Sequence, residues 1–446
     1  MKGALTLFLC LTLSVVFAQT PSGIGSHTYD KFETPKFCGT SCHTTFYVQW
    51  KQSMMSQAYT HHWDEIEYFE LAVPHAEKDP KVAEVKAGCN GCHSPLALMD
   101  GKVFPPPAPK ENTRANEGVS CEVCHSITGF TGDTPYNFNY VVEPGKTKFS
   151  TRLSGVESPA HSIKANPLLK TGDFCGICHN EKSPYDVWVK STHLEWKAGP
   201  YYTQGVQCQD CHMPKGEMKF AAMGNTYPDT RLHLFHGAHD PGKVRGTVEI
   251  RINPDIEELE PGEPINFTIA LFNGKTGHKF PSGSVEDRIL WLHVEVTGSD
   301  GTVYHLPVNK KGFPGEEYTI AADVLAYQDM GIPKNIPDFK GIQRDGVPVG
   351  DRIFRMPYFD NQGRMTIQQW NTASLGTDYR IGPRETKVET YTFNVPANAK
   401  PGKYTVKAIL NYALLVKPVG DFLNVPAEET TPIEVNQQFA SFTVLP

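Results

Sequence analysis

The carboxy-terminal half of the chain is dominated by segments in which apolar and polar residues alternate. This period of two is typical of strands that bury one face. Turn-forming residues, for example "GSDG" at 298–301, separate several of the segments. The pattern predicts seven strands: 246–252, 265–272, 289–296, 302–308, 389–395, 403–410 and 440–445. We expect an antiparallel β-sandwich of immunoglobulin type over 246–446, with an irregular Gly- and Pro-rich insertion near 309–386.

The chain before residue 246 shows helical spacing in short stretches only. The segment 53–65, "SMMSQAYTHHWDE", predicts a helix on which His61 and His62 point about 100° apart, so that one helix could reach two different sites. Long loops such as "FPPPAPKEN" at 104–112 join such stretches. We therefore predict a helical, loop-rich domain over 19–245 and an α+β multidomain chain overall.

The first 18 residues have the pattern of a secretory signal peptide. Lys2 precedes an apolar run, and the small-residue cleavage site "VFA" places the start of the mature chain at Gln19. No later run approaches the roughly 18 apolar residues that a membrane span needs. We expect an exported protein, periplasmic or extracellular, without a membrane span.

Composition narrows the set of partners. The chain has 446 residues, of which 39% are hydrophobic and 20% charged, and its formal net charge is −7. That length accommodates two ordinary domains. Because no basic stripe is present, nucleic acid is excluded as an expected partner.

The cysteines supply the strongest chemical signal. Of the 11 cysteines, Cys10 leaves with the signal peptide, and the remaining ten all lie before residue 213. Each belongs to a group in which two cysteines are followed directly by a histidine. The five groups are Cys38, Cys42 and His43; Cys89, Cys92 and His93; Cys121, Cys124 and His125; Cys175, Cys178 and His179; Cys208, Cys211 and His212.

This arrangement indicates covalently attached haem. Two thiols add to the two vinyl groups of a haem, and the next histidine becomes the proximal ligand of the iron. Five disulfides would leave the five histidines unexplained, and zinc does not require a histidine directly after each second cysteine. Motifs two and three, and motifs four and five, follow one another closely, which favours close pairs of haems.

The first motif, "CGTSCH" at 38–43, has three residues between its cysteines where the other four have two. We expect a bulge to absorb the additional residue, with Gly39 free to adopt a positive φ. The alternative is a decayed motif in which Cys38 and Cys42 are oxidised together, which would leave four haems.

An iron that only carries electrons also needs a distal ligand, usually histidine or methionine. Twelve of the 17 histidines lie outside the motifs. His278 lies beyond the last motif, in the loop "GKTGHKFPSG" at 274–283, from which it could cover a haem from the second domain. We interpret His293 and His305 as ordinary strand residues. The other distal candidates suggested by their surroundings are His61, His62, His161, His233, His236 and His239.

Several stretches resemble exported multihaem c-type cytochromes related to the tetrahaem electron-acceptor partner of hydroxylamine oxidoreductase. They include "CHTTFYVQWKQSMM", "GVSCEVCHSI", "SPAHS", "RLHLFHGA" and "TGHKFPSG". The resemblance implies mostly bis-histidine haems, with His161, His236 and His278 as distal ligands. Such relatives often have a histidine where this chain has Met55, so Met55 is a further candidate ligand.

These features favour a five-haem electron carrier that makes and breaks no bonds itself. Such a carrier can also be a subunit that polymerises into filaments. Its partners would be redox proteins or an extracellular acceptor. The alternative is an oxidoreductase that acts on nitrite, hydroxylamine or a sulfur oxyanion at one open haem. The lysine-proximal "CxxCK" motif of five-haem nitrite reductases is absent from the sequence. A third hypothesis gives the β domain a primary binding role.

Overall fold

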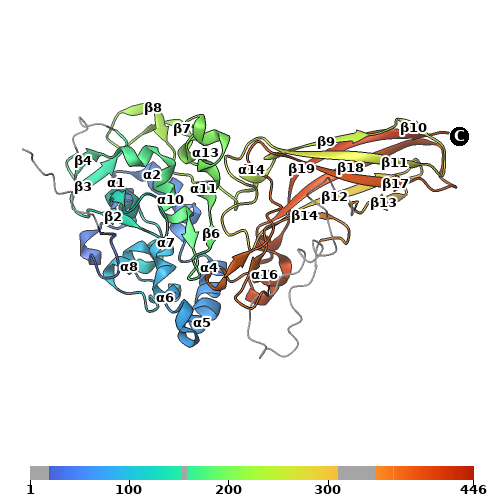
Figure 1. Cartoon of the computed structure of the whole chain (residues 1–446). Coiled ribbons are helices and arrows are strands. Elements are labelled where there is room, and N and C mark those ends of the chain that lie inside the picture. The colour runs from blue at the N-terminus through green and yellow to red at the C-terminus, as the bar shows by residue number, and fades with distance from the viewer. Residues whose placement is uncertain (1–19, 153–157, 310–346, 365) are drawn as a thin grey trace, which may run out of the picture.

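The computed structural model describes residues 20–152, 158–309, 347–364 and 366–446. The predicted signal peptide, 1–18, lies outside the described residues, and so does most of the predicted insertion before residue 347. Figure 1 shows two regions end to end, a helical one and a stranded one, with the C-terminus at the far tip of the strands. We call residues 20–245 the amino-terminal region and residues 246–446 the carboxy-terminal region.

The amino-terminal region consists of short helices, none longer than eight residues in the described chain, joined by loops and two-stranded sheets. Glu67–Ala72 is a π-helical turn between α4 and α5. Its α-helices are α1 Pro35–Ser41, α2 Thr44–Lys51, α3 Met54–Gln57, α4 His62–Ile66, α5 Val73–Lys78, α6 Val85–Gly88, α7 Asn90–His93, α8 Pro95–Asp100, α9 Cys121–Ser126, α10 Gly172–His179, α11 Thr192–Lys197, α12 Pro200–Thr203, α13 Cys208–His212 and α14 Pro241–Val244.

Four small sheets complete this region, pairing β1 with β2, β3 with β4, β5 with β6 and β7 with β8. Only the β3–β4 pair is parallel. The strands are β1 Ile127–Phe130, β2 Tyr140–Val142, β3 Thr147–Ser150, β4 Ser162–Ala165, β5 Glu181–Lys182, β6 Trp188–Lys190, β7 Lys215–Lys219 and β8 Thr226–Arg231.

The carboxy-terminal region is built from two larger sheets, and all seven predicted strands are present. One sheet has the order β10-β19-β18-β12-β13 with β14 also paired to β12, and the other has the order β17-β11-β9. Most neighbours are antiparallel, whereas β10 and β19 are parallel. The elements are β9 Val248–Pro254, β10 Glu258–Leu259, β11 Pro264–Asn273, β12 Ile289–Thr297, β13 Val303–His305, β14 Arg352–Phe354, β15 Tyr358–Phe359, β16 Ser374–Leu375, β17 Thr386–Asn394, β18 Gly402–Ala413, α16 Lys417–Leu423 and β19 Ile433–Val444.

The alternating sequence explains why these strands form. Every second residue of β11, beginning with Ile265, is buried, and the same holds for β17 and β18. The inward side chains of both sheets belong to one continuous apolar cluster, which includes Phe267, Leu292 and Val406. Removing these side chains from water contributes on the order of 2 kcal/mol each.

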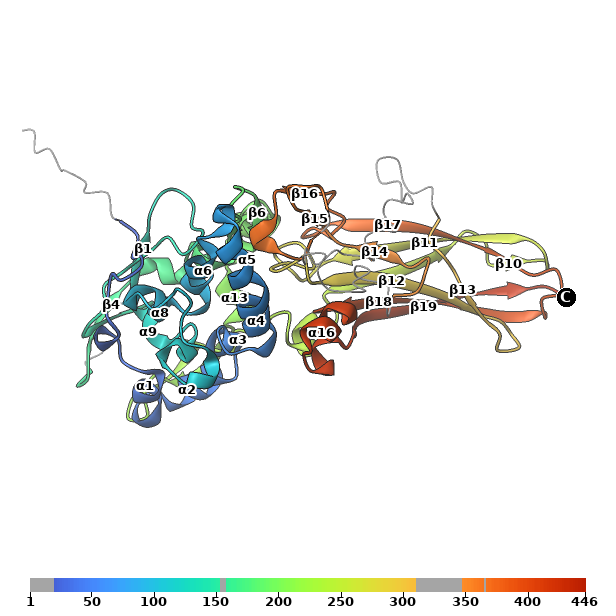
Figure 2. The same ribbon diagram turned by 90° about the horizontal axis from the view of Figure 1, so that it is seen from below.

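The two regions are packed against each other through apolar side chains. Trp63 of α4 belongs to the large cluster of the carboxy-terminal region. In return, Trp370 joins Tyr68 and Val73 in a cluster of the amino-terminal region, and its indole nitrogen donates to Nδ1 of His75 at 3.1 Å. Figure 2 shows α16 on the side of the strands that faces α4. Among the described residues, no helix is long and apolar enough to cross a membrane.

The predicted helix over 53–65 is wrong. The chain forms α3, then turns at residues 58–60, and begins again at α4. His61 has an extended backbone and precedes α4, so the rings of His61 and His62 lie close together, with their centroids 4.4 Å apart. They do not diverge from one helix toward two sites.

Candidate functional site

Each of the five Cys–Cys–His motifs lies on or at the end of a short helix. The motifs at 89–93, 121–125, 175–179 and 208–212 belong to α6–α7, α9, α10 and α13. All ten cysteines of the motifs are free. Helical backbone turns both sulfurs and the histidine toward one side, which is the arrangement that a haem attached at one edge requires.

The first motif accommodates its additional residue within α1. In the second motif, the amide of His93 donates to the Cys89 carbonyl at 3.0 Å, four residues back. In the first motif, the amide of His43 makes the same bond to the Cys38 carbonyl at 2.9 Å, five residues back. The histidine therefore keeps its position relative to the first cysteine through a turn that is one residue wider.

The role that we predicted for Gly39 is wrong. Gly39 is helical and does not have a positive φ. A Cβ atom at this position would lie 2.2 Å from the ring of Tyr47, so the glycine is required by the close approach of α2.

Four of the five motif histidines are oriented by a backbone carbonyl. Nδ1 of each donates to one carbonyl oxygen, and Nε2 is thereby left as the nitrogen that can bind iron. The four pairs are His43 with Phe220 at 2.6 Å, His93 with Ala58 at 2.7 Å, His125 with Phe149 at 2.7 Å and His212 with His236 at 2.6 Å.

Three motif histidines face a second histidine with nearly parallel rings. His43 and His161 have centroids 6.1 Å apart and an interplanar angle of 30°. For His125 and His233 the values are 6.3 Å and 11°. For His212 and His278 they are 6.4 Å and 14°.

This spacing matches the requirements of a shared metal ion. Two metal–nitrogen bonds of about 2.0 Å, added to the size of two imidazoles, put the ring centroids roughly 6.3 Å apart. Each pair therefore has the spacing at which one haem iron could bind both rings. His93 and His179 are not among the stacked pairs.

Burial favours the neutral form of three of these imidazoles. It lowers the pKa of His212 and His233 to about 4, and it also lowers the pKa of His278. Only a neutral imidazole offers a nitrogen lone pair to iron, so at pH 7 these rings are in the state that ligation needs.

The loop that carries His278 is fixed to the amino-terminal region by Glu195 of α11. The Glu195 carboxylate accepts the Lys279 amide at 3.2 Å and the Ser282 hydroxyl at 2.7 Å. It also pairs with Arg380 at 2.8 Å, and both side chains are almost fully buried. Asn273, wholly buried, donates to the His278 carbonyl at 3.2 Å.

The remaining predicted ligands occupy other surroundings. Nδ1 of His236 lies 2.8 Å from Asp240, and the half-exposed His236 ring is not stacked on a motif histidine. Because His233 is stacked on a motif histidine, it is the better candidate for a distal ligand. His61 and His62 both face Glu429, at 3.1 and 3.2 Å. The backbone carbonyl of Met55 accepts a hydrogen bond from the Val119 amide at 2.9 Å. Their roles as ligands stay predictions.

Thiols of different motifs meet in the interior. Cys38 and Cys121, Cys92 and Cys178, and Cys175 and Cys208 lie close enough that the second thiol of each pair shifts the pKa of the first. The contact between Cys175 and Cys208 is consistent with the expected pairing of motifs four and five, and the pairing of their haems stays a prediction. These contacts place motif three beside motif one, and motif two beside motif four, instead of joining motifs two and three as expected.

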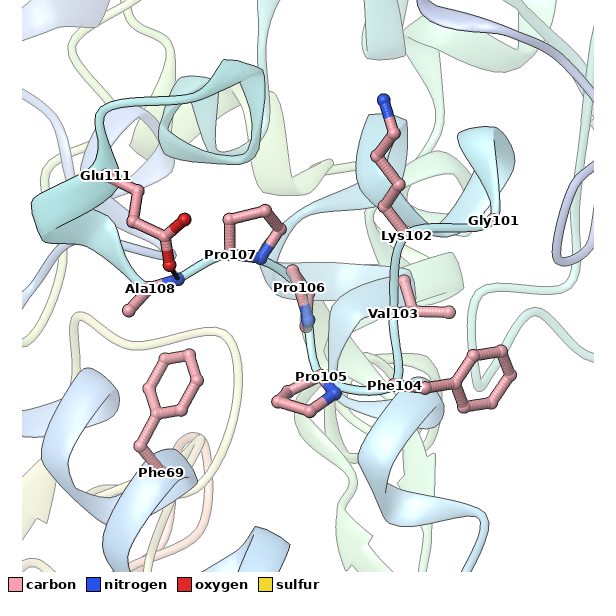
Figure 3. Close-up of a pocket in the computed structure, with 10 residues that line it drawn as sticks. All are labelled: Phe69, Gly101, Lys102, Val103, Phe104, Pro105, Pro106, Pro107, Ala108 and Glu111. Atoms are coloured by element: carbon pink, nitrogen blue, oxygen red, sulfur yellow. Dashed lines mark hydrogen bonds between the residues drawn. The ribbon is translucent and has the colours of Figure 1, made fainter.

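One hollow lies away from these residues. A cavity of about 510 Å³ is bordered by Phe69 and by the loop 101–111, as Figure 3 shows, with Glu111 accepting the Ala108 amide at 3.2 Å. Its lining contains neither histidine nor cysteine. A smaller one, of about 180 Å³, lies at Cys42 and His43, beside the first motif.

Motifs of this kind, together with stacked pairs of histidines, are typical of multihaem c-type cytochromes. Comparison with known families points to the same class: residues 38–126 match the family described as cytochrome c554 and c-prime, and residues 150–243 match the N-terminal region of the NapC/NirT cytochrome c family. The amino-terminal region is therefore similar to these multihaem cytochromes, whose haem c is covalently bound.

A solved structure shares the fold. The penta-haem cytochrome c552 from Thermochromatium tepidum is 20% identical, with a TM-score of 0.60 over 92% of this chain and 99% of that chain. The alkylpurine DNA glycosylase AlkC of Pseudomonas fluorescens is 9% identical over 46% of this chain and 32% of that one. Its TM-score of 0.18 is too low to indicate a shared fold. No match is found among curated proteins.

Proposed function

We propose that this chain is an exported five-haem c-type cytochrome that carries electrons along closely packed haems. The observation that supports this most is the set of three histidine pairs, each spaced for one iron. An iron with two protein ligands has no free position for a substrate, so it exchanges electrons without forming bonds to one.

A continuous path supports the same proposal. The thiol contacts join motif one to three, two to four and four to five. Cys124 of motif three also lies close enough to Cys175 of motif four to affect its pKa. Haems attached at these positions would form one connected group that branches at motif four, so an electron could pass from any haem to any other.

The proposal assigns all ten motif cysteines to haem attachment and the five motif histidines to proximal ligation. As distal ligands we propose His161 for the first site, His233 for the third and His278 for the fifth. The first motif is included because its histidine keeps both the backbone bond to the first cysteine and a stacked partner.

We also propose that the chain divides near residue 245, three residues before β9 begins, and that the second part is an immunoglobulin-like sandwich. Its role would be to supply His278 and a docking face for a redox partner protein, an extracellular acceptor or another copy of this chain. The protein would work in the periplasm or outside the cell.

Two measurements test the proposal. Intact-mass analysis should find five covalent haems, and four would remove the first motif from the account. Low-temperature electron paramagnetic resonance of the oxidised protein, with and without nitrite, hydroxylamine and sulfite, should show that none of the three ligands shifts any signal. A high-spin signal that moves with one of them would contradict a pure electron carrier and indicate an enzyme with an open iron.

A further inference from the structure

Two histidines and an aspartate meet on the outer face of the six-stranded sheet, in the carboxy-terminal region. In β12 the core residues Leu292 and Val294 flank His293, which therefore points outward. β13 pairs with β12 so that His305 lies opposite Glu295, on the same outer face as His293. Asp351 directly precedes β14. That strand pairs with residues 290–292 of β12, whereas β13 pairs with residues 295–297. Three segments distant in sequence thus converge.

The three side chains present their ligand atoms to one another. Nδ1 of His293 lies 3.0 Å from each carboxylate oxygen of Asp351, and Nε2 of His305 lies 2.8 Å from Oδ1. The imidazole rings are stacked, with centroids 4.9 Å apart and an interplanar angle of 11°. The carboxylate itself is completely buried beneath them.

The backbone turn at residues 348–351 positions the Asp351 carboxylate. The amide of Asp351 closes a turn onto the Pro348 carbonyl at 3.2 Å, and the amide of Val308 donates to the Gly350 carbonyl at 2.9 Å. Gly350 has a φ of +97°, and a Cβ atom there would lie 2.7 Å from Pro307. A side chain at residue 350 would force the turn away from β13 and withdraw Asp351 from the histidines.

The spacing suits a bound cation. Two ligand atoms that each lie about 2.1 Å from one ion, at angles between 90 and 109°, are roughly 3.0–3.4 Å apart. The nitrogen–oxygen distances of 3.0 and 2.8 Å are close to that range, and the three ligand atoms lie within 4.8 Å of one another. Imidazole nitrogen with carboxylate oxygen is a donor set for zinc and other divalent transition metals.

We propose that His293, His305 and Asp351 form a second kind of metal site, which binds one divalent transition-metal ion of the Zn²⁺ type and leaves at least one position to water. The ion would connect β12, β13 and the segment that leads into β14. The group formed by His61, His62 and Glu429 also has converging ligand atoms. Its histidines are candidates for haem ligation, so it belongs to the site already described.

The test is equilibrium dialysis of the haem-loaded full chain against Zn²⁺ after treatment with EDTA, with zinc and iron counted by mass spectrometry. The wild type should bind one zinc ion. The affinity of His305→Gln for zinc should be at least about tenfold weaker than that of the wild type. Asp351→Asn should lose the same ion. His27→Gln, which removes a histidine from the amino-terminal region, is the matched control and should bind zinc as the wild type does.

Zinc-edge X-ray absorption identifies the ligands of the zinc ion directly, because haem iron does not contribute to it. The wild-type spectrum should require two imidazole ligands. The proposal is overturned if the wild type takes up no zinc, if the absorption lacks imidazole scattering, or if His305→Gln binds zinc with unchanged affinity. Because His305 is on the surface, that variant should fold even if Asp351→Asn does not.

Discussion

The two regions are stabilised in different ways. In the carboxy-terminal region, one continuous cluster of buried apolar side chains fills the space between the sheets. In the amino-terminal region, most of the buried apolar residues fall into three smaller clusters around Phe32, Tyr68 and Tyr59. The motif cysteines Cys178 and Cys89 pack against two of these clusters. The carboxy-terminal region therefore contains its own apolar core. The amino-terminal region instead has cysteines that can attach haems, and these haems would complete its core.

The largest expected effect follows from withholding haem. A chain produced without haem attachment should leave the amino-terminal region unfolded, because its clusters are too small to offset the loss of chain entropy. The carboxy-terminal region should still fold. Limited proteolysis with mass spectrometry should then find one resistant fragment that begins near residue 246. Equal digestion of both regions, or equal resistance, would contradict this difference between the regions.

A second prediction concerns the contact that joins the regions. Glu195→Gln removes one of the two carboxylates that pair with the buried Arg380, which keeps Asp378 at 2.9 Å, and it should lower the free energy of unfolding by about 1.5–3 kcal/mol. Denaturant titration checks this. Asp421→Asn, in an exposed pair with Lys417 at 2.5 Å, is the control and should cost about 1 kcal/mol or less. Equal effects would mean that Glu195 does not fix the loop.

A third prediction compares two glycines next to haem motifs. Gly39→Ala places a methyl group against the Tyr47 ring and should cost about 1–3 kcal/mol, together with less haem attachment at the first motif. Gly88→Ala in α6 meets nothing within 4 Å and should be neutral or stabilise the protein by up to about 1 kcal/mol. Intact mass and thermal unfolding of both variants distinguish the two results. If Gly39→Ala matches Gly88→Ala, the close approach of α2 does not constrain the first motif.

The smallest effect depends on pH. Burial alone would raise the pKa of Asp378, but hydrogen bonds from Arg380 and Lys279 outweigh it and lower the pKa to about 2. A carboxyl group whose pKa is lower in the folded state stabilises the fold above its ordinary pKa, and this contribution is lost as pH falls through the lowered value. We expect a loss of at most about 2 kcal/mol between about pH 4 and pH 2.

Acid titration of the unfolding free energy checks this prediction against Asp378→Asn. The variant should show a correspondingly smaller decrease over the same range, because it has no carboxyl group to protonate. Identical acid curves for the two proteins would contradict the role of Asp378 in holding the His278 loop.

The sequence predicts the two regions unequally well. Alternation is a local signal, so the seven predicted strands are all found, although β13 has only three residues. The two- or three-residue strands β10, β14, β15 and β16 were not predicted, because no longer alternating run surrounds them. The motifs likewise contain their own chemistry within a few residues. The pairing of His43 with His161 depends on how the intervening chain is packed, and no local pattern encodes it.

Two further features depend on packing in the same way. The stacking of His233 on a motif histidine, which His236 does not share, is set by where β8 ends and by the Gln49 side chain, which accepts the His233 amide at 2.8 Å from α2. The break between α3 and α4 is fixed by tertiary contacts, including the bond from Nδ1 of His93 to the Ala58 carbonyl. Helical spacing over 53–65 could not reveal either contact.

The central claim is that the carboxy-terminal region supplies a ligand to a haem of the amino-terminal region. Low-temperature electron paramagnetic resonance of His278→Ala, compared with the wild type and with His236→Ala, tests it most directly. We expect one haem to change from low spin to high spin in His278→Ala and no change in His236→Ala. A His278→Ala spectrum identical to that of the wild type would show that the iron at His212 has a different sixth ligand, and the account of the two regions would fail.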